Sequence, residues 1–300
     1  MGTRIGSLAL ITNTLQDVSQ SQTTLATLQE QISSGMKSQT FQGLNGDVEQ
    51  FAQVTSELSR ASQFNTNNTL NISKLNTADS ALSTITDLAN SMNNLIVGAN
   101  GATAATNDIP QQMSALITSL QSQLNVTFDG SYMFGGTDTT NPPVTQAGLN
   151  AIVPGTATAN YYSGSQENQT IRADDTTTMA FPVRADDPAF QKIFAAAQLA
   201  ITAVQNGDAA GLTQAQTMMQ DGQSDLIALR SSVGAVSDNI TAVNSTLQQQ
   251  TTYWQQLSDG DSKTDIVAAS TQVSSYQAIL QASFQVYARL SQLSLVDYLK

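Results

Sequence analysis

"MQDGQSDLIALRSSVGAVSDNITAVNSTLQQQTTYWQQL", residues 219–257, carries the most regular apolar pattern in the chain. Steps of three and four residues from Met219 give twelve positions, of which ten are apolar. Such a heptad pattern places apolar side chains in a line along one side of a helix, called a seam below, where they pack against other helices. We therefore predict a long helix in the core of a helical rod. Its predicted core residues are Leu226, Leu229, Val233, Val236, Ile240, Val243 and Leu247.

Both ends of the chain have a seam of the same kind. The stretch "SSG" at 33–35 sets off the N-terminal helix, and Gly35 suits a left-handed helix end. The stretch "SDGDSKTD" at 258–265 is expected to break the long helix, and Ser262 and Asp265 have the capping-box spacing for a final helix. The N-terminal seam is Leu8, Ile11, Leu15, Val18, Leu25, Leu28 and Ile32. The C-terminal seam is Ile266, Val273, Tyr276, Leu280, Tyr287, Leu290, Leu293 and Leu295. Each seam is a candidate partner for the other.

Between these helices the pattern predicts more helix and one insertion of another kind. A long helix is expected over 48–97, with Asn65, Asn68 and Asp79 interrupting its seam, and Asp187 with Pro188 begins a later helix. Residues 131–185 are rich in Gly, Pro, Asp and Thr and contain short alternating runs, which indicates a small β-rich insertion. The predicted fold is mainly α, an elongated antiparallel rod with coiled-coil-like terminal helices. The predicted domains are the inner helix with its linker (1–47), the halves of the rod (48–130 and 186–262), the outer domain (131–185) and the C-terminal inner helix (263–300).

Composition excludes several classes of function. The chain has no cysteine and no histidine, so a disulfide framework, thiolate metal sites and Ser-His-Asp or Cys-His catalysis are ruled out. Its net charge of −12 and its scattered basic residues do not suit nucleic acid. Asp259, Asp261 and Asp265 superficially match a calcium loop, but Lys263 takes a ligand position and Gly260 is misplaced, which indicates a solvated turn. We predict no catalytic residue, no metal, no cofactor and no membrane span.

Four stretches of the chain resemble a known family. They are "LATLQEQISSGMK" (25–37), "FDGSYMFGGTDTTNPPV" (128–144), "YYSGSQENQTIRADD" (161–175) and "YQAILQASFQVYARLSQLSLVDYL" (276–299). Together they resemble the flagellin superfamily, and the second and fourth are similar to its hook–filament junction type. The family's usual polar signature after "SSG" is replaced here by "MKSQTFQGLNGD", so contacts made by that signature do not carry over to 36–47.

The resemblance implies a structural role in the bacterial flagellum. It implies a secreted, extracellular subunit that joins hook to filament, with the two terminal seams as assembly interfaces. The implied partners are further copies in a ring or tube, a neighbouring hook-associated protein, flagellin, an export chaperone and the flagellar type III apparatus. One alternative is the filament flagellin itself. Another is a flagellin-like surface binding protein or adhesin, whose only candidate stacking residues in the insertion are Tyr132, Phe134, Tyr161 and Tyr162.

Overall fold

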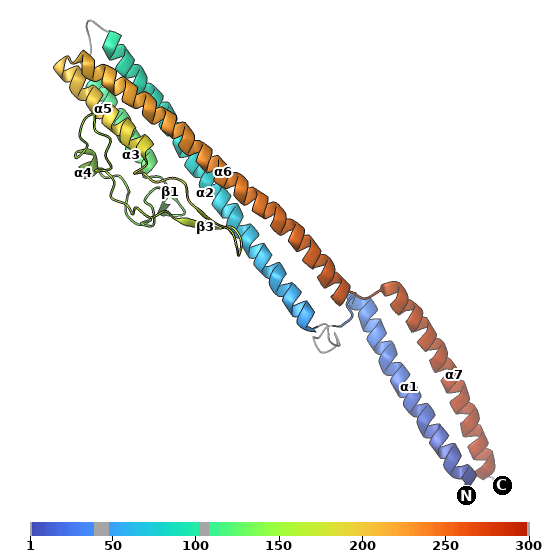
Figure 1. The fold of residues 1–300 in the computed structure, drawn as a ribbon. Coiled ribbons are helices and arrows are strands. Elements are labelled where there is room, and N and C mark those ends of the chain that lie inside the picture. The colour runs from blue at the N-terminus through green and yellow to red at the C-terminus, as the bar shows by residue number, and fades with distance from the viewer. Residues whose placement is uncertain (1, 39–47, 102–107, 299–300) are drawn as a thin grey trace. The chain divides into compact units, whose positions relative to one another are not determined.

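The protein is mainly α-helical, as the sequence predicts. A computed structural model describes the backbone of residues 2–38, 48–101 and 108–298, and the side chains within these ranges except at 2–11, 48, 261 and 290–298. In chain order (Figure 1), the helices within these ranges are α1 (Gly2–Ser34), α2 (Val48–Gly101), α3 (Ile109–Leu124), α4 (Gln146–Leu149), α5 (Pro188–Asn206), α6 (Ala209–Ser262) and α7 (Ile266–Tyr298). The chain divides into two compact units, residues 1–60 with 250–300 and residues 61–249.

The second unit, residues 61–249, is built on α2 and α6, which run antiparallel. Residues 61–101 and 209–249 each extend for about 60 Å at 1.5 Å per helical residue. Polar side chains join the two helices at three levels: Asn68 Nδ2 to Asn244 Oδ1 (2.9 Å), Arg230 to the Asp79 carboxylate (2.9 and 3.2 Å), and Gln223 Nε2 to Asn90 Oδ1 (2.9 Å). Two of the residues that interrupt the predicted α2 seam, Asn68 and Asp79, therefore make contacts that fix the pairing of the helices.

The apolar core of this unit follows the heptad spacing of both long helices. On α6 the side chains of Leu226, Leu229, Val233, Ile240 and Leu247 are buried, and those of Val236 and Val243 are half-buried. On α2 the buried positions recur every seven residues: Ala61, Asn68, Leu75, Leu82, Ala89 and Ile96. Asn68 is the one buried polar residue among those described.

Helices α3 and α5 complete a four-helix bundle around one half of this pair. Met113, Ile117, Leu120 and Leu124 of α3 and the face of α5 that includes Phe190, Ile193 and Phe194 are buried in the same core. The seam of α6 has a glycine at position 222, where an added Cβ would lie 2.9 Å from Ile193 Cγ1 and 3.1 Å from the Ala189 oxygen. Gly222 therefore lets α5 approach α6 closely.

The start of α5 forms as the sequence predicts. The Asp187 side chain accepts a hydrogen bond from the Ala189 amide (3.0 Å), Pro188 occupies the first turn, and Gly207 ends the helix in the left-handed conformation. The caps of α7 differ from the prediction. Asp265 itself caps α7, because its Oδ1 accepts from the amides of Val267 and Ala268 (both 3.0 Å). The capping-box assignment of Ser262 is wrong, since α6 continues through that residue and its hydroxyl bonds back to Ser258.

The insertion between α3 and α5 contains little regular structure. Its strands form two antiparallel ribbons, β1 (Thr127–Phe128) with β2 (Ser131–Tyr132) and β3 (Thr170–Arg172) with β4 (Thr178–Ala180). The rest is a folded coil around buried Phe134, Tyr161 and Phe181. Two glycines permit its tight packing: an added Cβ would lie 2.2 Å from the Asp138 oxygen at Gly135 and 2.1 Å from the Ser165 oxygen at Gly136.

The insertion is anchored to α2 by polar and cationic side chains. Asn68 Nδ2 donates to the Ala173 carbonyl beside β3 (2.8 Å). Lys74 donates to the side-chain oxygen of Gln169, and its ammonium lies 4.8 Å from the centre of the Phe181 ring. Desolvation lowers the pKa of Lys74. These contacts join the insertion to the helix pair in one unit.

Candidate functional site: the paired terminal helices

The first unit, residues 1–60 with 250–300, contains the two terminal helices. Helices α1 and α7 lie side by side (Figure 1), with the end of α1 next to the start of α7, so the pair is antiparallel. Among the side chains that the structure describes on these two helices, the buried ones are Val18 and Leu28 on α1 and Ala269 and Leu280 on α7. The candidate partnership between the two seams is thus present within one chain.

The structure divides the predicted seam residues into three groups. Leu25, Ile32, Val273 and Tyr276 are half-buried beside the four buried side chains. Leu15, Ile266 and Tyr287 are exposed. The side chains of Leu8, Ile11, Leu290, Leu293 and Leu295 lie outside the described part of the structure.

The positions of α1 that face α7 differ from the heptad positions predicted from the sequence. The buried and half-buried positions of α1 include 14, 18, 21, 25, 28 and 32, so Thr14 and Ser21 belong to the face, whereas Leu15 is 49% exposed. Two helices in contact bury only one narrow stripe each. The large apolar side chains beside that stripe therefore stay exposed.

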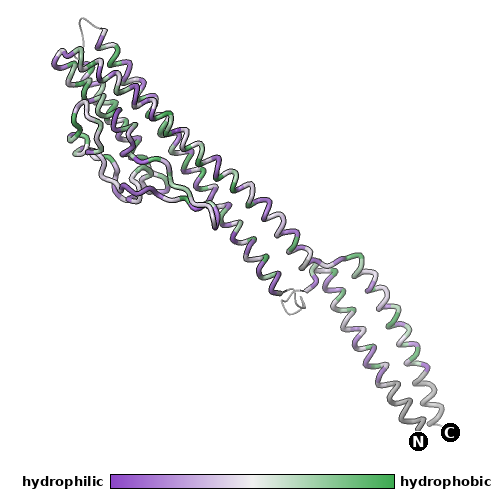
Figure 2. Tube along the Cα trace, viewed as in Figure 1, coloured by the Kyte–Doolittle hydropathy of each residue, from purple (hydrophilic) through white to green (hydrophobic). Residues whose placement is uncertain are grey.

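Helix α7 carries an unusual number of such exposed apolar side chains. Figure 2 shows apolar residues recurring along its described part. We call the following set the α7 outer surface: Ile266, Val267, Ile279, Phe284, Val286 and Tyr287. Single exposed apolar residues are ordinary, whereas six within 22 residues of one helix leave large apolar side chains exposed on several of its sides.

The terminal pair is also nearly free of charge. Within residues 266–289 of α7, Arg289 is the one charged side chain, and within residues 12–34 of α1 the charged side chains are Asp17 and Glu30. Charged groups are costly to bury without partners, whereas Ser, Thr, Gln and Ala are tolerated in close helix contacts. This composition suits a helix pair that packs against other protein on several sides.

A short backbone contact joins the end of α1 to the start of α7. We call residues 35–37 together with 262–264 the clasp. The Lys37 amide donates to the Ser262 oxygen (2.8 Å) and the Thr264 amide donates to the Gly35 oxygen (2.9 Å), which makes an antiparallel bridge between Met36 and Lys263. The Gly35 φ of 72° confirms the predicted left-handed turn.

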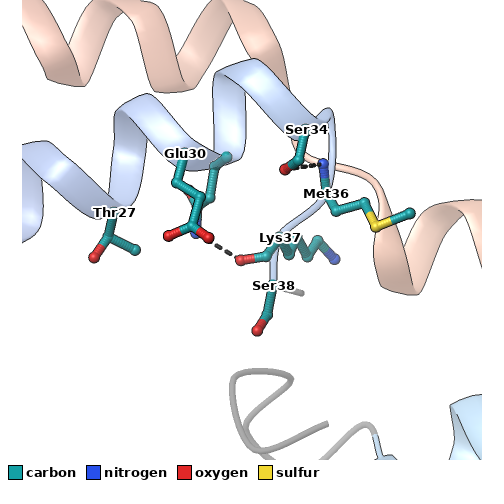
Figure 3. A pocket seen from close by; sticks show the side chains of 7 residues that line it. Thr27, Glu30, Ser34, Met36, Lys37 and Ser38 are labelled. Carbon is teal, nitrogen blue, oxygen red and sulfur yellow. Dashed lines mark hydrogen bonds between the residues drawn. The ribbon is translucent and has the colours of Figure 1, made fainter. Parts of the chain in front are cut away.

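Side chains reinforce the clasp. Lys37 Nζ donates to the Gly260 oxygen at the end of α6 (2.8 Å), and Gln31 Nε2 donates to the Lys37 oxygen (2.7 Å). Beside it lies a small pocket of about 180 Å³, lined by Thr27, Glu30, Gln31, Ser34, Met36, Lys37 and Ser38 (Figure 3). Sequence reasoning found the turn at Gly35 but missed Lys37, because no local pattern indicates a partner more than two hundred residues away.

The described residues contain no cluster of three or more His, Cys, Asp or Glu side chains placed to hold a metal ion. Within the same ranges, no helix is both long and apolar enough to cross a membrane.

These features define a helical protein whose first and last helices pair with each other and whose centre carries an irregular insertion. Residues 5–139 match the family model of the bacterial flagellin N-terminal helical region. The N-terminal part of the chain is therefore similar to the N-terminal region of bacterial flagellins.

Solved structures share this fold at low sequence identity. A Vibrio parahaemolyticus protein assigned to the flagellar hook-associated proteins aligns with a TM-score of 0.62 and 13% identity, over 72% of this chain and 97% of its own. FlgL from Bacillus cereus aligns with a TM-score of 0.55 and 16% identity, over 68% and 96% of the respective chains. FlgL from Xanthomonas campestris gives 0.54 and 13%, over 69% and 98%. A search of curated proteins found no match.

Proposed function

We propose that this chain is a structural subunit of the bacterial flagellum that joins hook to filament through self-assembly of its terminal helices. The observation that carries the proposal is the α7 outer surface, a set of six exposed apolar side chains on a nearly uncharged helix. The flagellin N-terminal helical region and the fold shared with FlgL and a hook-associated protein support the same role.

The apolar area of the α7 outer surface is large enough to drive association. Complete burial of one large apolar side chain contributes about 1.5–3 kcal/mol. Six side chains that are roughly half exposed would then contribute on the order of 5 kcal/mol per subunit when covered, before the costs of association. Contacts from α1 and with several neighbours would add to this figure.

The proposed partners follow from the same surface. Further copies of the chain would form a ring or tube, with a hook-associated protein on one side and flagellin on the other. Before assembly, an export chaperone and the flagellar type III apparatus would deliver the chain to an extracellular site. The apolar terminal helices, which carry few charged side chains, are the part of the chain that suits all these contacts.

Neither alternative function has a specific observation in its favour. For a carbohydrate-binding adhesin, the insertion would have to present aromatic rings, but Phe134 and Tyr161 are buried in its core. Tyr162 is half-buried and donates to the Ser165 oxygen (2.6 Å). For a main filament subunit, the match to the flagellin N-terminal helical region is equally compatible, so it gives that alternative no advantage over the junction role.

A deletion strain of the source bacterium tests the proposal. We expect cells without this chain to carry hooks, to lack filaments and to release flagellin into the medium, and the wild-type gene to restore filaments. Normal filaments in the deletion strain would refute the junction role. Loss of hooks as well as filaments would place the chain at an earlier step.

A further inference from the structure

Asn68 differs from the other core residues of the second unit. It is the one buried polar residue among those described, and the other positions of its heptad repeat on α2 hold alanine, leucine or isoleucine. A single asparagine in an apolar helix seam specifies one arrangement of the helices at a cost in stability. The contacts of the Asn68 amide group indicate which arrangement it specifies here.

Both hydrogens of that amide group are donated, each to a different element. One goes to Oδ1 of the Asn244 side chain on α6 (2.9 Å), and the other goes to the Ala173 carbonyl beside β3 (2.8 Å). Oδ1 of Asn68 is buried and accepts no hydrogen bond from the described residues. The side chain therefore acts through its two donated bonds, which join α2, α6 and the insertion at one buried point.

The β3–β4 ribbon runs along α2 in the opposite direction (Figure 1), and two other contacts flank that of Asn68. Lys74 binds the side chain of the residue before β3, and the Arg172 guanidinium lies 5.6 Å from the centre of the Phe64 ring. Lys74 is half-buried and Arg172 is 60% exposed, so water competes for both cations. Of the three, the bond from Asn68 to Ala173 is the one that is fully buried.

We propose that Asn68 is a positioning residue, which holds the β3–β4 ribbon at one place on α2 and costs the helix pair some of the stability that a leucine would supply. The buried side chain of Ile171 keeps the ribbon against the core, but apolar burial has no direction and tolerates displacement along the rod. Hydrogen bonds are directional. The bond to Asn244 fixes the rotation of the amide group, and the bond to Ala173 then fixes the ribbon.

A distance measurement on the purified full-length chain tests this inference. Spin labels are attached to Thr178→Cys in β4 and Ala242→Cys in α6, because both positions are exposed and the chain has no cysteine of its own. We expect one narrow distance peak when Asn68 is present. After Asn68→Leu, which keeps the branched shape of the side chain but removes the donor, we expect a broadened or shifted distribution.

Two controls separate positioning from stability. Leu82→Ala, at a fully buried position of the same seam, should lower Tm by roughly 6–12 °C and keep the narrow peak. Arg172→Ala, which removes the exposed contact of the same ribbon, should change neither the peak nor Tm. Asn68→Leu should show the opposite of Leu82→Ala: a Tm equal to or above that of the parent, with the narrow peak lost.

A narrow, unshifted peak for Asn68→Leu would refute the positioning role. A fall in Tm as large as that of Leu82→Ala would also overturn the inference, because Asn68 would then stabilise the helix pair. If leucine prevents folding, Asn68→Ala repeats the distance measurement, since it too lacks the donor, and a narrow peak for that variant would refute the role equally. These measurements use the purified chain, so they decide the inference even if the proposed flagellar function fails.

Discussion

Replacement of Leu226 by Ala tests whether the seam of α6 forms the core of the second unit. The Leu226 side chain is fully buried, whereas its neighbour Ile227 is 63% exposed on the same helix. Truncation of a buried leucine removes its transfer free energy and leaves a cavity, which together cost about 2.7–5 kcal/mol. For a unit of this size, each kcal/mol lowers Tm by about 2–4 °C, so a loss of about 3 kcal/mol lowers Tm by roughly 6–12 °C.

The assay is thermal unfolding followed by circular dichroism and calorimetry, with Ile227→Ala as the matched control. Substitution at an exposed position changes stability by about 0.5 kcal/mol or less, so Ile227→Ala should leave Tm almost unchanged. The single tryptophan, Trp254, lies in the first unit and reports separately on that unit. Equal Tm values for Leu226→Ala and the parent, or a larger effect from Ile227→Ala, would refute the assignment of this seam to the core.

Two further predictions concern the insertion. Gly136→Ala should unfold or loosen the insertion, because the new Cβ would lie 2.1 Å from a backbone oxygen, whereas Gly130→Ala, with the same left-handed backbone but open space around it, should cost only about 1 kcal/mol of stability. Limited proteolysis compares the two variants, and equal protease sensitivity would count against the close approach at Gly136. Alkali should also destabilise the insertion. Burial raises the pKa of Tyr161 well above the ordinary 10 and that of Tyr162 to about 12. The stability that these protonated tyrosines contribute is complete below pH 10 and should fall as the pH rises from 10 towards 12. Tyrosinate absorbance that rises fully near pH 10, with no unfolding, would contradict this.

The main elements of the fold could be predicted from sequence because the long helices repeat their apolar residues every seven positions. On α6 that repeat alone identifies the side that is buried, from Leu226 to Leu247. The start of α5 could be predicted equally well, since Asp187 and Pro188 act through contacts within a few residues of themselves.

The rest depends on distant partners. Asn68 interrupts an apolar seam in the sequence, and only the fold shows that it bonds both α6 and the insertion. Gly222 interrupts the apolar seam of α6, and only the close packing of α5 against this position explains why a glycine is needed there. On α1, the sequence offered Leu15 and Val18 equally, but contact with a single partner helix buries Val18 and leaves Leu15 exposed. Apart from Gly35, no local sequence pattern predicts the clasp.

The most direct test of the assembly role is a charge placed on the α7 outer surface. Phe284→Glu puts a carboxylate where an exposed phenylalanine stands, and Gln281→Glu adds the same charge at an exposed polar position of the same helix. Neither side chain is buried in the chain alone, so thermal unfolding of both purified variants should match the parent. In an assembled structure Phe284 would be covered, and an unpaired buried carboxylate costs several kcal/mol. We predict that, in the complemented deletion strain, Phe284→Glu abolishes filaments at normal export while Gln281→Glu retains them. Full filaments with Phe284→Glu would contradict the assembly role of α7.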